Sequence, residues 1–496
     1  MDTIASTKQG SLRGRANDGM HIFKGVPYAE APIGHNRLLP PKRPLAWDGV
    51  RDAFEFGPKP PQTPMPPQVA EMLPETPGPG DNCLTLNIWA PVAHGERCPV
   101  MVWIPGGMYE FHATGASPLY DGSRFARDGV VCVTINYRVG AEGFLYLDDG
   151  VANCGLLDQI AALEWVRENV ANFGGDPNDV TVFGESAGAL SIATLLAMPR
   201  ARGLFHRAIL QSGAGHHVSQ PSTAKRIGER LCQKLGVAPL RQAIAQLPVE
   251  RLLEAQLSLR MDLMTRSDAD FWGDVALSGL PWQPVIDGEV LPGRPVDRVV
   301  FGSSADVDLM IGTNLSENRL FLVPGGEIDR VTHEAVATMV SAYGLPVEST
   351  IADYSKRFPG ASAGDLMAAI QTDWYWRLPA IRLAEAHALQ GHGRTFMYEF
   401  AWRSPQFAGR LGACHALEIP FVFDTLGRAS AALAGPNPPQ QLADAMHRAW
   451  VSFATNGEPG WHAYDGRHPA TMRFDTHCEV VKDPRHAERT LWEGAR

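Results

Sequence analysis

The segment Asp179-Val-Thr-Val-Phe-Gly184-Glu-Ser186-Ala-Gly188-Ala-Leu190 carries the strongest structural signal in the chain. Its first half has the β-branched and aromatic residues of a buried strand, and the Ala- and Leu-rich residues 187–198 are typical of a helix that ends at a proline. The Gly-x-Ser-x-Gly turn between them predicts a tight strand-to-helix corner, where the two glycines avoid side-chain collisions. We interpret Ser186 as a catalytic nucleophile; the alternative is an ordinary serine in a glycine turn.

Length and composition indicate a large, mildly acidic globular protein. The 496 residues are 45% hydrophobic and carry a formal net charge of -10. Because no run of Lys or Arg occurs, the sequence predicts neither a nucleic-acid partner nor an anionic-membrane partner. The first residues lack a basic and apolar leader, and no segment is apolar for long enough to cross a bilayer. We therefore expect a cytoplasmic protein.

The seven cysteines predict neither a disulfide framework nor a metal site. Their number is odd, and no Cys-x-x-Cys pair occurs. We expect reduced, mostly buried thiols at Cys83, Cys98, Cys132, Cys154, Cys232, Cys414 and Cys478.

Strand-like and helix-like segments alternate around the serine turn, which is typical of an α/β fold. Residues 100–104 and 130–135 are continuous apolar runs that suit strands buried on both faces of a parallel sheet. Residues 158–172 have apolar positions at helical spacing and lead directly to the strand before Ser186. Further strands are predicted at residues 84–89, 208–212, 307–312 and 395–400, and helices at residues 225–235, 240–256 and 442–453.

No repeat, low-complexity tract or clear linker divides the chain, so we expect one domain over residues 1–496. Helical insertions are predicted near residues 222–280 and 332–390, the second of them over one end of the sheet. Prolines crowd residues 58–80 without a hydrophobic period, which predicts a long surface loop. Loops of this length are often functional, with disorder as the alternative.

Taken together, these segments resemble the type-B carboxylesterase family of α/β-hydrolases, which includes bacterial p-nitrobenzyl-type esterases and, more distantly, cholinesterases. The resemblance runs from about Gly10 to about Pro459. The matching motifs are residues 23–29, 82–89, 169–177, 184–188, 284–288 and 413–421. It implies an α/β-hydrolase fold with a large, mostly parallel central sheet, flanking helices and helical insertions over the active-site end.

The resemblance also supplies partners for the serine, which needs a base because a hydroxyl is a poor nucleophile at neutral pH. The family's catalytic histidine precedes a Leu-Glu-Ile-Pro-Phe run, which implies His415. The acid that orients the histidine is usually a glutamate shortly after a strand, which implies Glu317, with Asp308 as the nearest competitor. The order Ser, acid, His agrees with the α/β-hydrolase arrangement.

Backbone donors for the developing oxyanion are implied at Gly107, Met108 and Ala187. This loop departs from the family pattern, because Pro105 stands where the family has histidine and Met108 where it has a small residue. Backbone N–H groups survive such changes, but Met108 puts a flexible apolar side chain where the acyl group would lie. Glu185 and Ser212 match family positions close to the triad and are predicted to be supporting hydrogen-bond partners.

Other family features bear on the substrate. No tryptophan occurs between Asp48 and Ile88, where cholinesterases hold a quaternary ammonium, so choline esters are poor candidates. Residues 374–376, Trp-Tyr-Trp, are candidates for lining a substrate channel, with aromatic core packing as the alternative. Cys83 lies where secreted relatives form a disulfide, but no cysteine precedes it.

The sequence therefore predicts a serine carboxylesterase that hydrolyses carboxylic esters through an acyl-enzyme intermediate. Hydrolysis of carbamates or amides by the same residues is the first alternative, and a noncatalytic binding protein on this fold is the second. No metal or organic cofactor is implied. The expected partner is a small-molecule ester, and the expected state is a monomer or a weak homo-oligomer. Activity should fall as His415 is protonated, near pH ~6.5 for an unperturbed imidazole.

Overall fold

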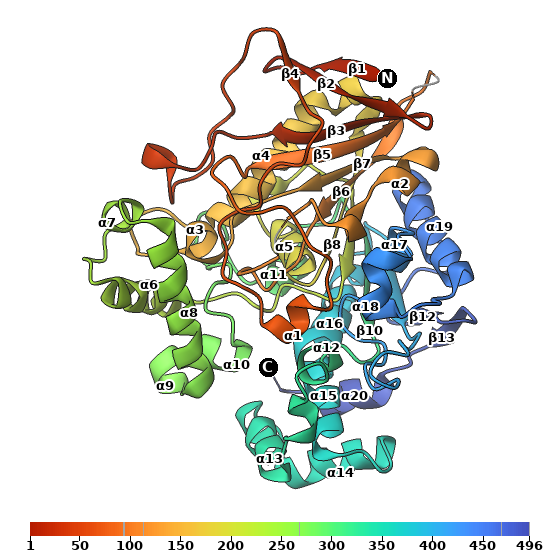
Figure 1. Ribbon diagram of the computed structural model, residues 1–496. Coiled ribbons are helices and arrows are strands. Elements are labelled where there is room, and N and C mark those ends of the chain that lie inside the picture. Colours follow the sequence, from red (N-terminus) through yellow and green to blue (C-terminus); the bar gives the residue numbers. More distant parts are fainter. Residues whose placement is uncertain (93–94, 113, 267, 468, 496) are drawn as a thin grey trace.

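The computed structural model describes residues 1–92, 95–112, 114–266, 268–467 and 469–495, and a single mixed β-sheet runs through them (Figure 1). In spatial order its strands are β1 (Asp2–Ser6), β2 (Ser11–Asn17), β3 (Met20–Pro27), β5 (Thr85–Pro91), β7 (Val131–Ile135), β6 (Cys98–Ile104), β8 (Gly175–Glu185), β9 (Arg207–Gln211), β10 (Asp308–Asn314), β11 (Thr395–Phe400), β12 (Ala470–Phe474) and β13 (Glu479–Lys482), and β4 (Val50–Asp52) pairs with β2.

The centre of the sheet is parallel, and its edges are antiparallel except for β4, which pairs with β2 in parallel. All neighbours from β7 to β12 pair in parallel, whereas β1, β2, β3 and β5 join as antiparallel neighbours at one edge and β13 at the other. The carboxyl ends of parallel strands lie at one edge of a sheet, and in open α/β sheets this edge is where ligands bind. β8 is the third strand of this parallel region and ends at Glu185, so Ser186 stands at that edge.

Side chains of the central strands alternate between two hydrophobic cores, one on each face of the sheet. Val100 and Val102 enter one core, together with side chains of α4 (Cys154–Asn169), α5 (Ala187–Leu195) and α16 (Leu378–Ala388). Met101 and Trp103 enter the other core, where they meet side chains of α19 (Gln440–Asn456) and α2 (Ser123–Arg127). A strand buried on both faces needs a continuous apolar run, which explains the composition of this segment.

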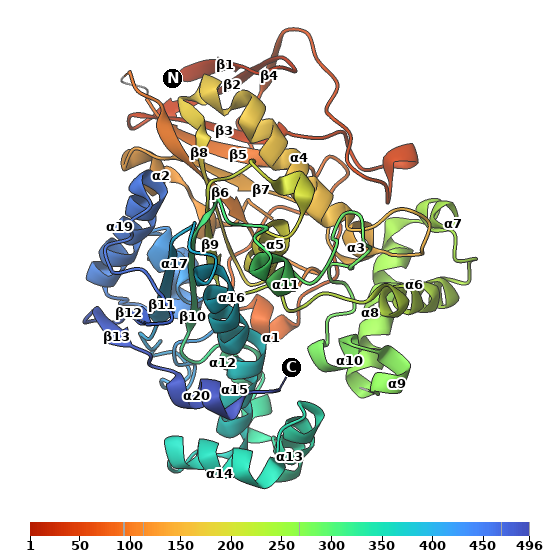
Figure 2. The same cartoon turned by 180° about the vertical axis from the view of Figure 1, so that it is seen from behind.

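Most helices other than those just assigned to the two cores of the sheet belong to two groups (Figures 1 and 2). The first group is α6 (Pro221–Leu235), α7 (Arg241–Ala245), α8 (Val249–Thr265), α9 (Ala269–Trp272) and α10 (Val275–Ser278). The second is α13 (His333–Ala342), α14 (Val347–Arg357) and α15 (Ala363–Thr372), which pack around a small core of their own. Shorter helices are α1 (Pro67–Ala70), α3 (Gly140–Phe144), α11 (Pro295–Val300), α12 (Arg319–Leu322), α17 (Ile419–Val422), α18 (Ala431–Ala434) and α20 (His486–Leu491).

The structure differs from the sequence-based expectations in a few places. The single helix expected over residues 240–256 is two helices, because Pro248 interrupts it and caps the start of α8. The proline-rich segment 58–80 contains the one-turn helix α1. The strand before Ser186 is longer than expected, and the strands β12 and β13 near the end of the chain were not predicted.

All seven cysteines are free thiols; Cys98 and Cys478 are partly exposed and the others are buried, as expected. In the described ranges, no helix combines the length and apolar character needed to cross a membrane.

Candidate active site

The turn at Ser186 is a strained corner that only glycine neighbours permit. Ser186 has φ 55° and ψ -124°, a conformation that costs a non-glycine residue free energy. A Cβ atom on Gly188 would lie 1.9 Å from the carbonyl oxygen of Ile104, and one on Gly184 would lie 2.6 Å from the same oxygen. The glycines are therefore needed because β6 passes close beside the turn, rather than because of a collision with the serine itself.

Neighbouring strands hold this corner in place. The Ser186 N–H donates to the carbonyl oxygen of Gln211 at the end of β9, at 2.9 Å. The serine side chain is nearly buried yet lines a cavity. Ala187 is the first residue of α5, so its N–H is one of the donors that a helix start leaves without an intrahelical partner.

His415 and Glu317 lie together beside this corner. His415 Nδ1 is 2.7 Å from Glu317 Oε2, and the Glu317 carboxylate is fully buried. Its other oxygen accepts hydrogen bonds from Ser212 Oγ at 2.7 Å and from the Asn314 N–H at 2.6 Å. With both oxygens occupied, the carboxylate orients the imidazole with Nδ1 toward Glu317 and Nε2 away from it.

The second ring nitrogen lies next to another carboxylate. His415 Nε2 is 3.0 Å from Glu185 Oε1, outside hydrogen-bond geometry, and neither atom has a hydrogen-bond partner among the described residues. Within the described chain, no hydrogen bond joins Ser186 Oγ to His415 either. Glu185 directly precedes Ser186, so this contact puts the imidazole beside the serine corner. Catalytic hydrogen bonds often tighten only when substrate is bound.

The two carboxylates control the protonation of His415. Burial by itself would lower the pKa of His415, but the negative charges of Glu185 and Glu317, together with the hydrogen bond to Glu317, outweigh it and raise the pKa above the ordinary value. Burial also raises the pKa of Glu185, against the attraction of His415. The expected loss of activity near pH ~6.5 assumed an unperturbed imidazole, and the raised pKa moves that loss to higher pH.

A third buried glutamate completes the cluster, and the sequence analysis gave it no role. Burial and the neighbouring carboxylates raise the pKa of Glu418 to about 8. It accepts hydrogen bonds from Gln211 Nε2 at 3.0 Å and from Asn314 Nδ2 at 2.6 Å. Its position three residues after His415 was visible in the sequence, but only the tertiary structure shows that it is buried beneath the site.

The predicted oxyanion loop follows β6 and is held by its own hydrogen bonds. The Pro105 carbonyl accepts from Tyr137 Oη at 2.9 Å, and the Gly107 carbonyl accepts from the N–H of Glu110 at 3.0 Å. Gly107 and Met108 have φ values of 114° and 55°. Their N–H groups donate to no other group in the described part of the chain. The loop also lies against Ser186, because a Cβ atom on the preceding Gly106 would be 3.0 Å from Ser186 Cβ.

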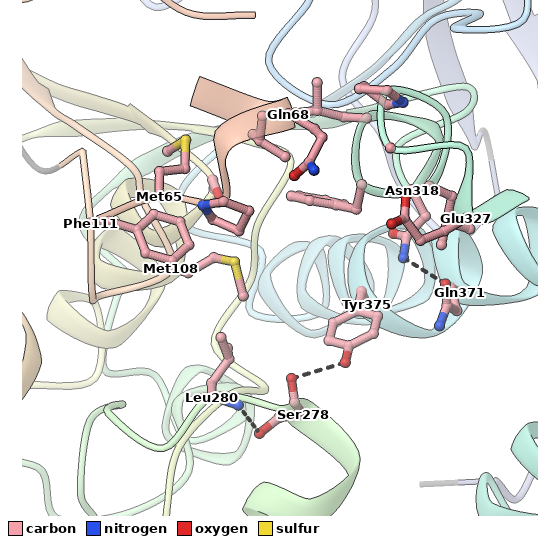
Figure 3. A pocket seen from close by; sticks show the side chains of 18 of the residues that line it. Met65, Gln68, Met108, Phe111, Ser278, Leu280, Asn318, Glu327, Gln371 and Tyr375 are labelled. Atoms are coloured by element: carbon pink, nitrogen blue, oxygen red, sulfur yellow. Dashed lines mark hydrogen bonds between the residues drawn. The ribbon is translucent and has the colours of Figure 1, made fainter. Parts of the chain in front are cut away.

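A cavity of about 360 Å³ opens beside Ser186. Figure 3 shows Met65, Phe111 and Met108 along one side of it and Asn318, Glu327 and Gln371 along the opposite side. The complete lining also contains Pro66, Gln68, Val69, Leu190, His217, Arg260, Met264, Ser278, Leu280, Leu320, Phe321, Leu322, Pro324, Gly325, Tyr375 and Trp376. The proline-rich segment 58–80 thus contributes to the pocket wall, and Met108 lines the cavity together with Ser186.

The aromatic residues 374–376 divide between the two roles considered for them. They form a π-helical turn (Asp373–Arg377) between α15 and α16. Tyr375 and Trp376 line the cavity, whereas Trp374 packs in the core with its ring stacked 4.5 Å from that of Tyr343. The ring of Trp376 also lies 4.3 Å from the His415 ring, and its Nε1 donates to Asn318 Oδ1.

Among the described residues, no group of three or more His, Cys, Asp and Glu side chains is arranged to hold a metal ion. Asp308, the alternative to Glu317, lies at the start of β10 and pairs with Arg394 at 2.7 Å, away from the serine corner. Of the predicted residues, the structure brings together Ser186, Glu317 and His415, with Glu185, Ser212 and the oxyanion loop around them.

Comparison with known proteins finds similar proteins that align with nearly the whole chain. Residues 1–492 match the Carboxylesterase family. The para-nitrobenzyl esterase of Bacillus subtilis (strain 168) is 36% identical over 98% of this chain and 97% of its own length. The phenmedipham hydrolase of Pseudarthrobacter oxydans is 33% identical over 98% and 99%. The solved structure of the Geobacillus stearothermophilus carboxylesterase Est55 covers 99% of this chain and 100% of that chain, at 38% identity and a TM-score of 0.85.

The sheet topology and the serine corner make this protein an α/β-hydrolase, as predicted. The matches define it more narrowly: the chain belongs to the carboxylesterase family, and it is a carboxylic ester hydrolase. The family resemblance found in the sequence is thereby confirmed.

Proposed function

We propose that the protein hydrolyses carboxylic esters through an acyl-enzyme intermediate formed on Ser186. His415 takes the proton of the Ser186 hydroxyl as the oxygen attacks the ester carbonyl, and returns it to the leaving alcohol. Water then attacks the acyl-enzyme carbonyl while His415 takes its proton. His415 returns that proton to the Ser186 oxygen as the carboxylic acid is released. Glu317 remains ionised and holds the imidazole in one tautomer. The main support is the 2.7 Å contact between His415 Nδ1 and Glu317, with Nε2 making no hydrogen bond to the described residues beside the serine corner.

Charge on the carbonyl oxygen would be stabilised by backbone N–H groups. Gly107, Met108 and Ala187 are the proposed donors, and their backbone is fixed before substrate arrives, by the turn after β6 and by the start of α5. Donors that need no reorganisation are the most effective kind, and one is worth about two to three orders of magnitude in kcat.

A panel of chromogenic esters assayed with the wild type and Ser186→Ala tests the proposal. We expect the alanine variant to lose nearly all turnover while it still folds, because the serine hydroxyl makes no hydrogen bond within the described residues. Stoichiometric release of the alcohol before steady-state turnover would show the acyl-enzyme directly. Wild-type-like turnover by the alanine variant would exclude Ser186 as the nucleophile.

Carbamates and amides are the alternative substrates, because the triad does not choose the leaving group. Two relatives are named for different substrates: one is a para-nitrobenzyl esterase and the other is a phenmedipham hydrolase. Their names indicate that the family acts on more than one kind of substrate. Comparing kcat/KM for a matched ester, carbamate and anilide with the same acyl or carbamoyl group separates the possibilities. We expect the ester to be preferred.

A further inference from the structure

The cavity beside Ser186 contains a cationic side chain that the proposed chemistry does not use. Arg260 projects from α8 into the cavity lining, and its side chain is 14% exposed. Its Nη1 is 2.6 Å from Oε2 of Glu110, whose side chain is only 1% exposed. Placing a charged pair against a largely apolar wall is costly, and an apolar pair of similar size is often as stable. A role in binding a ligand therefore explains the Arg260–Glu110 pair better than a contribution to the stability of the protein.

Glu110 attaches Arg260 to the oxyanion loop. The Glu110 N–H donates to the carbonyl oxygen of Gly107 at 3.0 Å, so the residue that holds the guanidinium belongs to the same turn as the proposed oxyanion donors. Thr63 Oγ1 donates to Glu110 Oε1 at 3.2 Å, and the guanidinium carbon lies 5.1 Å from the centre of the Phe111 ring. These contacts hold the guanidinium beside Phe111 in the cavity lining.

The guanidinium retains unused donors. A guanidinium has five N–H groups, and the described residues provide an acceptor only for Nη1. Nε and Nη2 are left to water or to a ligand. When a substrate displaces water from an apolar cavity, donors that lose their partners cost free energy, whereas an acceptor on the substrate restores the bonds.

The charges around Arg260 decide what kind of acceptor fits. Glu110 already neutralises the guanidinium, and the carboxylates of Glu185 and Glu317 lie at the catalytic end of the site. A carboxylate on the substrate would meet no net positive charge and would be repelled by these groups. A neutral carbonyl oxygen accepts the hydrogen bonds without that repulsion.

We propose that Arg260 is a specificity-determining residue that binds a neutral carbonyl oxygen on the substrate, so that the enzyme prefers esters with a second carbonyl group in the acyl or alcohol chain. This inference rests on the proposed function of the Ser186 site, because it concerns the substrate of that site.

The test compares pairs of esters that differ only by a ketone in place of a methylene group. The first series has p-nitrophenol as the leaving group and a keto group moved one carbon at a time along the acyl chain. The second has an acetyl group and the ketone in the alcohol chain. For each pair, the ratio of kcat/KM for the keto ester to that for the plain ester is measured, after subtraction of uncatalysed hydrolysis. We expect the wild type to show a maximum in this ratio at one ketone position.

The informative variant is the double substitution Arg260→Met with Glu110→Gln. It removes both charges, avoids leaving Glu110 buried without its partner, and retains an acceptor for Thr63. We expect the ratio at the preferred position to fall about ten- to a hundredfold, the worth of hydrogen bonds from a charged donor, while kcat/KM for plain esters changes much less. Arg266→Met, at the exposed end of the same helix and outside the cavity lining, is the control and should leave the ratio unchanged.

The outcomes separate this inference from the function on which it rests. If the wild type hydrolyses neither keto nor plain esters, the proposed function of Ser186 fails. If it hydrolyses both and the double variant keeps the wild-type ratio at every ketone position, only the role of Arg260 is overturned. A preference for esters with a free carboxylate at the same position, lost in the double variant, would overturn the assignment of a neutral acceptor.

Discussion

Replacing Glu185 with glutamine should move the acid limb of the pH–activity profile to lower pH. In the wild type, the His415 ring lies between Glu317, 2.7 Å from Nδ1, and Glu185, 3.0 Å from Nε2. Both carboxylates favour the imidazolium and raise the pKa of His415 despite its burial. In the proposed mechanism only the neutral imidazole accepts the proton of Ser186, so we expect activity to fall as the pH falls through this raised pKa. Removal of one carboxylate lowers the pKa and extends activity to lower pH.

The expected size of the shift follows from the contact distance. Two unit charges separated by 3.0 Å interact by about 5.5 kcal/mol at an effective dielectric constant of about 20, which corresponds to about four pKa units. Burial raises the pKa of Glu185 and so disfavours its charged form, which makes this figure an upper limit. We therefore expect a displacement of about 1–3 pH units, the usual effect of one nearby opposite charge.

The assay is kcat/KM for one chromogenic ester across the range in which His415 titrates, at constant ionic strength, for the wild type and Glu185→Gln. Glu327→Gln is the matched control, because it removes a carboxylate that lines the cavity beside Ser186, is 46% exposed and pairs with Arg330. Solvent screens such a charge, and its removal should displace the limb by less than about half a pH unit. An unchanged limb in Glu185→Gln, or a displacement to higher pH, would refute the reasoning.

Three further substitutions test the packing of the site. Gly188→Ala should abolish activity and lower the yield of folded protein, because the new methyl group would lie 1.9 Å from a carbonyl oxygen of β6; normal activity with an unchanged unfolding midpoint would contradict this. Met108→Gly should increase kcat/KM for bulky acyl esters relative to acetyl esters, because it removes the thioether beside the serine and suits φ 55°; an unchanged ratio would show that Met108 does not limit the acyl group. Glu418→Gln should lower the free energy of unfolding in denaturant titrations by about 1–3 kcal/mol, because an amide cannot accept from both Gln211 and Asn314. The side-chain amide of Gln211 cannot flip to compensate, because its oxygen already accepts a hydrogen bond from Trp450 Nε1. An unchanged unfolding curve would show that the hydrogen-bond network rearranges.

Sequence periodicity predicted the central strands and most helices well, because these segments are buried and their composition reflects it. Residues 100–104 face two cores at once, so an apolar run was required and could be recognised. The boundary errors have local causes. Pro248 divides an otherwise continuous helical pattern. β12 and β13 carry mixed polar and apolar residues because they lie at an edge of the sheet, where one face or end remains exposed.

The catalytic assignments differ in how far the sequence alone supported them. The serine corner could be predicted from local residues, because the turn requires glycine two positions before and two positions after Ser186. Glu317 and His415 were found through a family resemblance and not through spacing, because nearly a hundred residues separate them. Glu418 and Arg260 received no role, because a glutamate or an arginine in a sequence does not reveal what it is buried against.

The sequence by itself determined the α/β class, the position of the strained turn and the identity of the serine that the turn carries, because these depend on side chains within a few residues of one another. The tertiary structure decided the environment of that serine. It places Glu185 against His415 Nε2, Glu418 beneath the cluster, and Arg260 in the cavity wall through its pair with Glu110. Charges and hydrogen bonds act over a few ångströms of space, and only the folded chain brings residues so far apart in sequence within that distance.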